Sequence, residues 1–281
     1  MFYLDFRKYM KNLLIRSITG ITLVVLIISG ILYSKYSFAL LFFIIMIGCL
    51  IEFFYFFRTS GIHPLTIYSV FIGGLFFLFT FLITSEILSP PYYLLFPVAF
   101  LFLPVYELFR KKGNNISNIA TGILGLSYIA TPFCLSNYVV FINGTYNSFP
   151  LILLFILIWT NDTGAYLVGM SMGKHKLFPR ISPKKSWEGL IGGIILTILV
   201  SLIFVFIKQN ISVFNGVLLG ILVSVSSVFG DFTESMFKRS FNIKDSGKLI
   251  PGHGGFLDRF DSMLFAVPIY LCYIKLFGIG I

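Results

Sequence analysis

Charged residues and glycines gather in one part of this chain, residues 235–261, which reads SMFKRSFNIKDSGKLIPGHGGFLDRFD. The stretch holds five cations, three carboxylates and a Pro-Gly-His-Gly-Gly turn. Cations beside a glycine-rich turn suit phosphate, because charged side chains and backbone amides both donate to its oxygens. Carboxylates at helical spacing suit a hard divalent cation. The stretch therefore predicts metal-assisted chemistry on phosphates.

Two pairs of carboxylates have the spacing of one helix face, Asp231 with Glu234 and Asp258 with Asp261. Two such pairs could direct oxygens at one point and hold one or two metal ions. Mg²⁺ typically takes one or two protein carboxylates and completes its octahedron with water and substrate phosphate. We favour a metal site, since both pairs flank one glycine turn. The alternative is ion pairing with the nearby cations Lys238, Arg239 and Arg259.

The glycine turn at residues 251–255 permits close approach of a ligand to backbone amides. His253 within it could donate to phosphate or take part in proton transfer, and Gly254 and Gly255 would shape the turn. A plain loop is the alternative for this segment.

Two upstream blocks carry further polar groups. Asp162 interrupts an apolar run, where a carboxylate is costly unless it has a function, either as a metal ligand or in holding a lysine. Residues 182–188 read Ser-Pro-Lys-Lys-Ser-Trp-Glu, and we predict a helix start with Ser182 as N-cap. Lys184 and Lys185 beside a helix N-terminus form a candidate anion site, the alternative being a basic loop that only sets topology.

Composition determines the class of protein that positions these groups. Of the 281 residues, 57% are hydrophobic and 11% charged, against about 25% charged in soluble domains. We therefore predict an all-α, polytopic integral membrane protein. It forms a single domain over residues 1–281, with N-terminal helices in 1–145 and catalytic helices and loops in 146–281.

The apolar runs predict about nine transmembrane helices, since a span needs roughly 20 apolar residues. They are placed at residues 13–33, 36–57, 65–84, 92–109, 118–141, 150–170, 189–207, 212–232 and 260–278. The first follows a basic stretch but lacks a small-x-small cleavage site, so a retained helix is expected. Long polar loops are expected at 171–188 and 233–259.

In this predicted topology, the lysines and arginines lie mainly on one side of the membrane. With the N-terminus inside, 18 of the 21 lysines and arginines fall on the cytoplasmic side, and Lys35, Lys208 and Lys275 fall outside. The predicted active site therefore faces the cytoplasm. No transit peptide or long soluble tail is evident, which favours a bacterial plasma (inner) membrane. The net charge of +10 follows largely from these loops, which contact anionic lipid, and no nucleic-acid partner is expected.

The C-terminal blocks resemble the phosphatidate cytidylyltransferases, or CDP-diacylglycerol synthases. The resemblance covers roughly the last 120 residues, and the N-terminal half is similar only as a set of apolar helices. Upstream, residues 161–166, 182–189 and 230–235 match family blocks. The family signature is matched without a departure by Ser235, Lys238, Arg239, Lys244, Asp245, Pro251, His253, Gly254, Gly255, Asp258, Arg259 and Asp261.

This resemblance implies a reaction of CTP with phosphatidic acid that yields CDP-diacylglycerol and pyrophosphate. It also implies a homodimer, Mg²⁺ and a second, monovalent cation such as K⁺. Asp231, Asp258 and Asp261 would hold the metal and, with Lys238, Arg239 and Arg259, form the catalytic set. Substrate would be bound by Ser182, Lys184, Lys185, Lys244, His253, Gly254, Gly255, Asp162 and Glu234.

Three other functions are alternatives to the cytidylyltransferase reaction. A CTP-dependent lipid kinase needs the same metal and cations, but attack would fall on the γ-phosphorus. An aspartate-rich membrane prenyltransferase would require the motif Asn-Asp-x-x-Asp, but Asn161-Asp162 is followed by Thr, Gly and Ala with no second carboxylate. A transporter of anionic solutes predicts broken helices in paired halves, whereas the polar groups here gather in the C-terminal half.

Glu52 and Glu107 near helix ends receive no role beyond an expected structural pairing. Cys49, Cys134 and Cys272 lie in apolar runs and are expected to act as small hydrophobes.

Overall fold

The computed structural model describes residues 2–111, 113–142, 144–208, 211–243, 245–247 and 254–277, with the backbone alone for 2–16. Helices dominate these residues, and one two-stranded antiparallel hairpin completes them. The predicted all-α fold class is therefore confirmed. The elements are α1 (Phe2–Tyr33), α2 (Lys35–Arg58), α3 (Thr66–Thr84), η1 (Pro90–Leu94), α4 (Leu95–Leu108), α5 (Asn115–Gly125), η2 (Leu126–Ala130), α6 (Thr131–Val140), α7 (Phe149–Met172), β1 (Lys176–Phe178), β2 (Ser182–Ser186), α8 (Trp187–Lys208), α9 (Val213–Ser240) and α10 (Leu257–Phe277).

Among the described residues, eight helical segments are long and apolar enough to cross a membrane. They correspond to the second to ninth predicted spans. The first predicted span corresponds to α1, in which Ser17–Tyr33 is an apolar helical segment. The prediction of a polytopic membrane protein is thus confirmed.

Two predicted spans are not continuous α-helices. The predicted span at 92–109 begins with the 3₁₀ turn η1, which carries Pro90 and Pro91 in its first turn. The predicted span at 118–141 contains the π-helical turn η2, directly before Pro132 in the first turn of α6. Proline has no amide hydrogen to donate to the preceding turn, so a wider turn can form there without losing a bond.

The loop predicted at 233–259 was wrong at its beginning, because α9 continues to Ser240. The additional turns carry Glu234 and Lys238, which form an ion pair at the i,i+4 spacing that supports a helix. Glu234, Lys238 and Arg239 therefore have the fixed geometry of a helix rather than that of a loop.

The helix start predicted at Ser182 was also wrong. Ser182 lies in β2, where it pairs with Phe178 of β1. Helix α8 begins at Trp187, and the Ser186 hydroxyl accepts a hydrogen bond of 3.1 Å from the Gly189 amide. Ser186 is thus the N-cap, because a cap needs an amide two or three residues ahead inside the helix.

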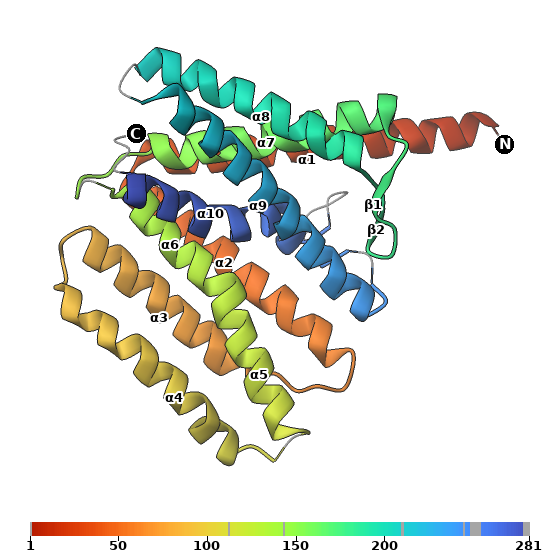
Figure 1. Cartoon of the computed structure of the whole chain (residues 1–281). Coiled ribbons are helices and arrows are strands. Elements are labelled where there is room, and N and C mark those ends of the chain that lie inside the picture. The colour runs from red at the N-terminus through yellow and green to blue at the C-terminus, as the bar shows by residue number, and fades with distance from the viewer. Residues whose placement is uncertain are drawn as a thin grey trace.

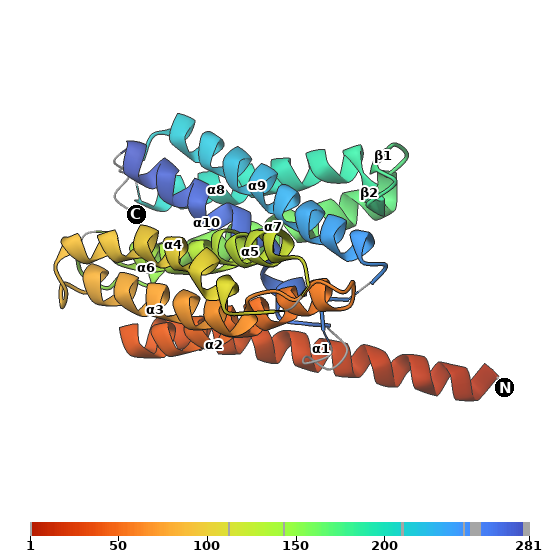
Figure 2. The same ribbon diagram turned by 90° about the horizontal axis from the view of Figure 1, so that it is seen from below.

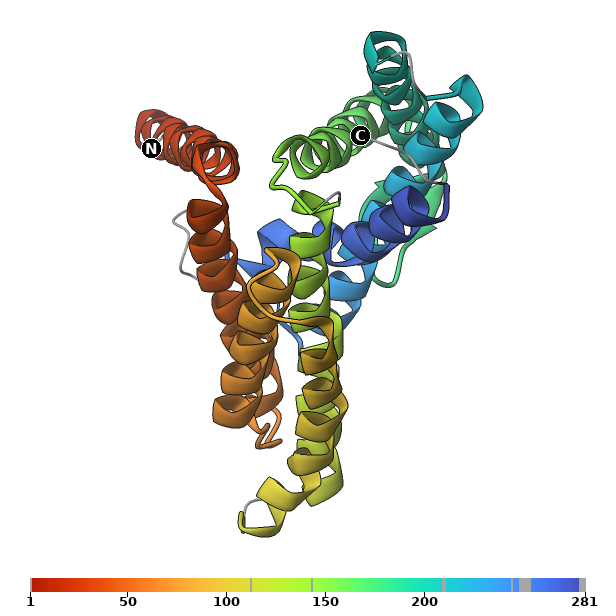
Figure 3. The same ribbon diagram turned by 90° about the vertical axis from the view of Figure 1, so that its left-hand side faces the viewer.

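The helices form two groups that meet in an aromatic core. Helices α7 to α10 lie together with the hairpin, while α2 to α6 form the second group (Figure 1). Helix α1 runs along one face and its N-terminal part projects beyond the other helices (Figure 2). Viewed from the side, α1 lies at one edge of the molecule, where it contacts α2 and α7 (Figure 3).

Four buried rings join the two groups. Phe133 of α6 lies 6.0 Å, centroid to centroid, from both Phe42 of α2 and Phe260 of α10. Phe155 of α7 closes the circuit at 6.3 Å from Phe42 and Phe260. Three of these contacts are edge-on and the Phe133–Phe260 contact is tilted, and aromatic pairs of this kind each contribute about 0.5–1.5 kcal/mol beyond burial. The core therefore holds α10, which carries two predicted catalytic carboxylates, against the N-terminal helices.

Candidate active site

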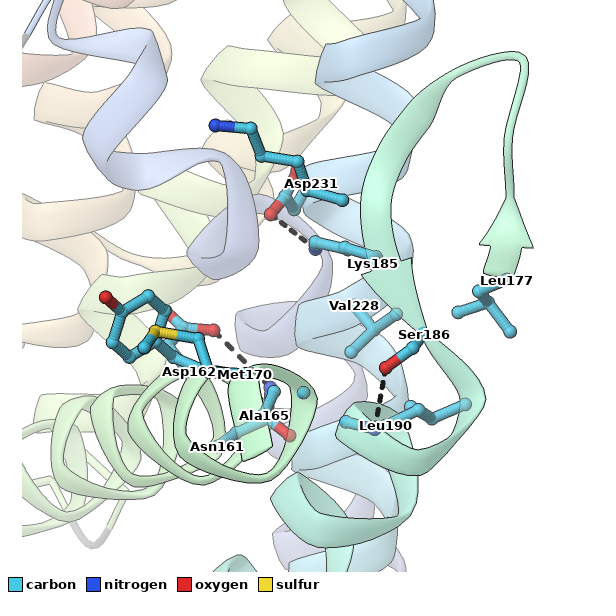
Figure 4. Close-up of a pocket in the computed structure, with 14 residues that line it drawn as sticks. Asn161, Asp162, Ala165, Met170, Leu177, Lys185, Ser186, Leu190, Val228 and Asp231 are labelled. Carbon is cyan, nitrogen blue, oxygen red and sulfur yellow. Dashed lines mark hydrogen bonds and ion pairs between the residues drawn. The ribbon is translucent and has the colours of Figure 1, made fainter. Parts of the chain in front are cut away.

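A cavity of 500 Å³ lies between α7, the hairpin and the ends of α8 and α9 (Figure 4). Its polar lining includes Asp162, Lys184, Lys185 and Asp231. Lys185 extends from β2 and pairs with Asp231 of α9 at 2.5 Å. The structure thus brings together four residues that the sequence assigned to the site from three separate blocks.

The hairpin is fastened at both of its ends. Glu188 of α8 accepts the backbone amides of Lys174 and His175 at 3.1–3.2 Å. Arg239 of α9 donates to the carbonyl of Ile181 at 3.4 Å. These bonds hold the start of β1 and the turn that follows it, and because β1 pairs with β2 they also keep Lys184 and Lys185 of β2 beside the cavity. Arg239, predicted to bind phosphate, therefore has a positioning contact here.

The position of the Asp162 side chain depends on its buried neighbour Asn161. Asn161 is 1% exposed, accepts a hydrogen bond from the Ser224 hydroxyl and donates to Asp162 at 3.4 Å. Gly193 of α8 packs against Asn161, where a Cβ atom would lie 2.7 Å from the amide oxygen. The close packing of α7, α8 and α9 thereby presents Asp162 to the cavity.

A second cavity of 190 Å³ lies on the other side of Asp162. Its polar lining consists of Asp162, Asp258, Arg259, Asp261 and Ser262. The opposite wall is apolar and belongs to α1, with Gly20, Leu23, Val24 and Ile27. Asp162 lines both cavities, so it connects the space lined by Lys184, Lys185 and Asp231 with the space lined by Asp258 and Asp261, two of the three predicted metal ligands.

Asp258 is fully engaged by the protein. One oxygen lies 2.7 Å from the ammonium group of Lys238. The other accepts hydrogen bonds from the Ser246 amide at 2.9 Å, the Ser246 hydroxyl at 2.8 Å and the Gly255 amide at 2.9 Å. Its carboxylate is 7% exposed, so a metal ion could reach it only by displacing one of these partners.

Lys238 lies between two carboxylates. Besides Asp258 it pairs with Glu234, which is completely buried. The lysine side chain is 14% exposed. Ion pairing with Lys238, the alternative that the sequence left open for these carboxylates, is thus observed for Glu234 and Asp258.

Asp261 has fewer partners among the described residues than Asp258. Its oxygen accepts the Ser262 amide at 2.7 Å, and no cation pairs with it among the described residues. The carboxylates of Asp231 and Asp162 repel it electrostatically. A cation between these three helices would relieve that repulsion.

Within the described ranges, no group of three or more His, Cys, Asp or Glu side chains is close enough to hold a metal ion. Mg²⁺ needs only one or two protein carboxylates when substrate phosphate and water supply the rest. Asp261 fits this requirement directly, whereas Asp231 and Asp258 each pair with a lysine, Lys185 and Lys238, which a metal ion would replace.

The glycine turn is described only in part. Lys244 and His253 lie outside the described residues. Gly254 has a φ of +82°, which favours glycine, and a Cβ atom on it would meet the Asp258 carboxylate. The predicted need for glycine at this turn is confirmed for Gly254. Its close neighbour is a protein carboxylate, and phosphate binding there stays a prediction.

Sequence reasoning missed the role of Glu52. This residue of α2 accepts the amides of Phe256 at 3.1 Å and Leu257 at 2.9 Å, at the beginning of α10. The signal was a carboxylate inside an apolar helix, and its partners are backbone groups that a sequence motif does not reveal. Glu107 behaves as predicted, with an ion pair of 2.9 Å to Arg110.

Comparison with known proteins agrees with this geometry. A phosphatidate cytidylyltransferase of Staphylococcus saprophyticus is 48% identical over 116 residues, 41% of this chain and 45% of that protein. The enzymes of that name from Haemophilus influenzae and Staphylococcus aureus are each 50% identical, over 127 and 118 residues. These matches cover 43% and 41% of this chain and 44% and 45% of the relatives, so the matched part spans less than half of each curated protein. The model of the cytidylyltransferase family matches residues 14–277, almost the whole sequence, and the chain therefore belongs to the cytidylyltransferase family.

Proposed function

We propose that this protein transfers CMP from CTP to phosphatidic acid, giving CDP-diacylglycerol and pyrophosphate for phospholipid synthesis. The observation that carries the proposal is the 500 Å³ cavity, which is lined by Lys184, Lys185, Asp162 and Asp231 and in which Lys185 pairs with Asp231. It offers cations for phosphates and carboxylates for a divalent ion in a chain with membrane-spanning helices. The names of the curated relatives support the choice of CTP and phosphatidic acid.

The reaction needs no covalent enzyme intermediate. A phosphate oxygen of phosphatidic acid attacks the α-phosphorus of CTP, and the bond from that phosphorus to the bridging oxygen breaks. Pyrophosphate leaves with the electron pair. The barrier is mainly the repulsion between two anions and the charge on the leaving group, so positioned cations lower it. A bound Mg²⁺ would supply further charge neutralisation.

The role that we propose for each residue depends on which cavity it lines. Lys184 and Lys185 are placed to bind the phosphates of CTP, and Lys185 would exchange Asp231 for phosphate as its partner. Arg259 lines the smaller cavity, where the lipid phosphate would meet the carboxylates. Asp231 and Asp261, with Asp258, would hold Mg²⁺, and Lys238 would then leave Asp258 and bind a substrate phosphate. A K⁺ ion is proposed on the family resemblance alone.

The proposed setting is a bacterial plasma membrane, with the active site open to the cytoplasm and the protein acting as a homodimer. The eight helices of the described ranges that are long and apolar enough to cross a membrane support the membrane setting. The cytoplasmic orientation rests on the distribution of lysine and arginine, and cysteine accessibility on either side of sealed vesicles would test it.

The reaction can be tested with purified protein in detergent, Mg²⁺ and CTP. Phosphatidic acid or diacylglycerol is added, and pyrophosphate and CDP are measured separately. Pyrophosphate released only with phosphatidic acid supports the proposal. CDP released with diacylglycerol would instead identify a lipid kinase that attacks the γ-phosphorus, and no product with either lipid would reject both reactions.

A further inference from the structure

Glu52 forms a contact between halves of the chain that are far apart in sequence. It lies on α2, is 5% exposed, and binds the amides of Phe256 and Leu257, the latter 205 positions away. Each of its oxygens accepts one amide, at 3.1 Å and 2.9 Å. The second oxygen also accepts the Ser246 hydroxyl at 3.1 Å. Three donors from the signature region thus converge on one carboxylate of the N-terminal half.

The bonds meet a need of helix α10. The first amides of a helix have no partner within it, and the helix dipole places partial positive charge there. Leu257 is the first residue of α10, and Phe256 directly precedes it. Glu52 therefore caps α10 from another helix, with a charge of the favourable sign.

The chain leaves space for this carboxylate. A Cβ atom on Gly247 would lie 2.5 Å from an oxygen of Glu52, and one on Gly255 would collide with the other oxygen. One turn before Glu52, Gly48 makes room for the ring of Phe256, which a Cβ atom there would approach to 2.7 Å. Side chains and backbone are thus fitted to each other on both sides of the contact.

The contact leads directly to the reaction centre. The Ser246 hydroxyl has a single proton and lies between the two carboxylates, 3.1 Å from Glu52 and 2.8 Å from Asp258, so it links them, and Asp258 holds Lys238 at 2.7 Å. Asp258 is the second residue of α10, and Asp261 follows one turn later on the same helix. Whatever fixes the start of α10 therefore fixes both carboxylates.

We propose that Glu52 is a positioning residue of the active site: by binding the Phe256 and Leu257 amides and Ser246, it sets the place and orientation of Asp258 and Asp261. The expected effect on turnover rests on the proposed function, whereas the contact of Glu52 with the start of α10 does not depend on it. Loss of the carboxylate is expected to displace the start of α10 and to reduce turnover more than it reduces stability.

Glu107 provides a matched control. It is a second buried glutamate of the N-terminal half, 1% exposed, with bonds to Arg110 at 2.9 Å and Asn118 at 2.6 Å. It contacts none of the residues placed in the active site. Glu107→Gln should therefore lower stability without a specific effect on turnover.

The experiment compares Glu52→Gln and Glu107→Gln with the wild-type protein in detergent. The side-chain amide introduced by Glu52→Gln would donate where the native oxygen accepts, so one α10 amide loses its partner. Supporting groups around metal and active sites typically contribute 10- to 100-fold to activity. Glu52→Gln should lower kcat per folded molecule by about 10- to 100-fold, raise the Mg²⁺ concentration needed for half-maximal rate, and speed hydrogen exchange in the peptide containing residues 255–257. Glu107→Gln should change none of these three quantities.

Ser246→Ala provides a second variant if Glu52→Gln does not fold. It should lower kcat as well, and the double variant should lose less than the product of the two single losses, because both act through one contact. A Glu52→Gln protein with wild-type kcat, or an equal loss in Glu107→Gln, would overturn the positioning role. If the wild-type protein lacks the proposed reaction, the exchange comparison still decides the contact, and unchanged exchange at 255–257 would reject it.

Discussion

The ammonium group of Lys185 lies 2.5 Å from a carboxylate oxygen of Asp231, and this pair joins strand β2 to helix α9 beside the larger cavity (Figure 4). Both side chains are about one third exposed, at 31% and 33%. The Lys185 ammonium group also lies 4.8 Å from the centroid of the Phe232 ring. A phosphate entering the cavity could therefore compete with Asp231 for a lysine that is already held in place.

Replacing Lys185 with methionine should lower kcat/KM for CTP by about 10- to 100-fold, because a hydrogen bond to a charged group contributes about 1.5–3 kcal/mol. Steady-state kinetics with varied CTP would measure the change. Lys176→Met is the control, since Lys176 is exposed on the paired strand and does not line the cavity. Unchanged kcat/KM in Lys185→Met would remove the lysine from the site.

Asp258→Asn and Asp261→Asn should both abolish turnover and leave membrane insertion intact, but they should differ in stability. Asp258→Asn breaks an ion pair and hydrogen bonds at a nearly buried carboxylate, which should cost about 2–4 kcal/mol. Asp261→Asn removes a charge that its neighbours repel, so the melting temperature should stay the same or rise.

Thermal unfolding of the two variants in detergent would check this difference, and turnover with added Mg²⁺ would check the activity. Near-normal activity in either variant would contradict its assignment as a metal ligand. A metal-binding role for Asp261 would also be doubtful if Mg²⁺ stabilised wild type and Asp261→Asn equally.

Ser186→Ala should destabilise the protein by about 1 kcal/mol, because it removes the N-cap of α8. Ser182→Ala should leave stability unchanged, since Ser182 lies in β2 and caps no helix. Melting temperatures of the two variants would distinguish them. Equal losses would mean that α8 does not begin where the structure places it.

Gly193→Ala should destabilise by about 1–3 kcal/mol through overpacking, because its Cβ atom would lie 2.7 Å from the Asn161 amide oxygen and 2.9 Å from the Asn161 carbonyl. At Gly169, on the opposite helix of the same contact, the nearest atom would be 3.6 Å away, an ordinary packing distance. Gly169→Ala should therefore be tolerated. A melting-temperature series would test this asymmetry of the α7–α8 contact.

The sequence alone determined the membrane class, the approximate helices and the charged residues that line the two cavities. Each of these properties depends on local pattern: apolar length sets a span, and spacing within one segment brings Asp258 and Asp261 onto one helix. Because the cavity-lining residues come from polar blocks in an apolar chain, burial cost alone identified them as functional candidates.

Tertiary structure decided which groups are partners. Asp258 was predicted as an open metal ligand, yet its oxygens are occupied by Lys238, Ser246 and Gly255. Glu52 lacked a role until its amide partners in α10 were known. Backbone donors carry no side-chain signature, and the distance between two helices depends on how the whole core packs, so neither can be read from residue types and spacing.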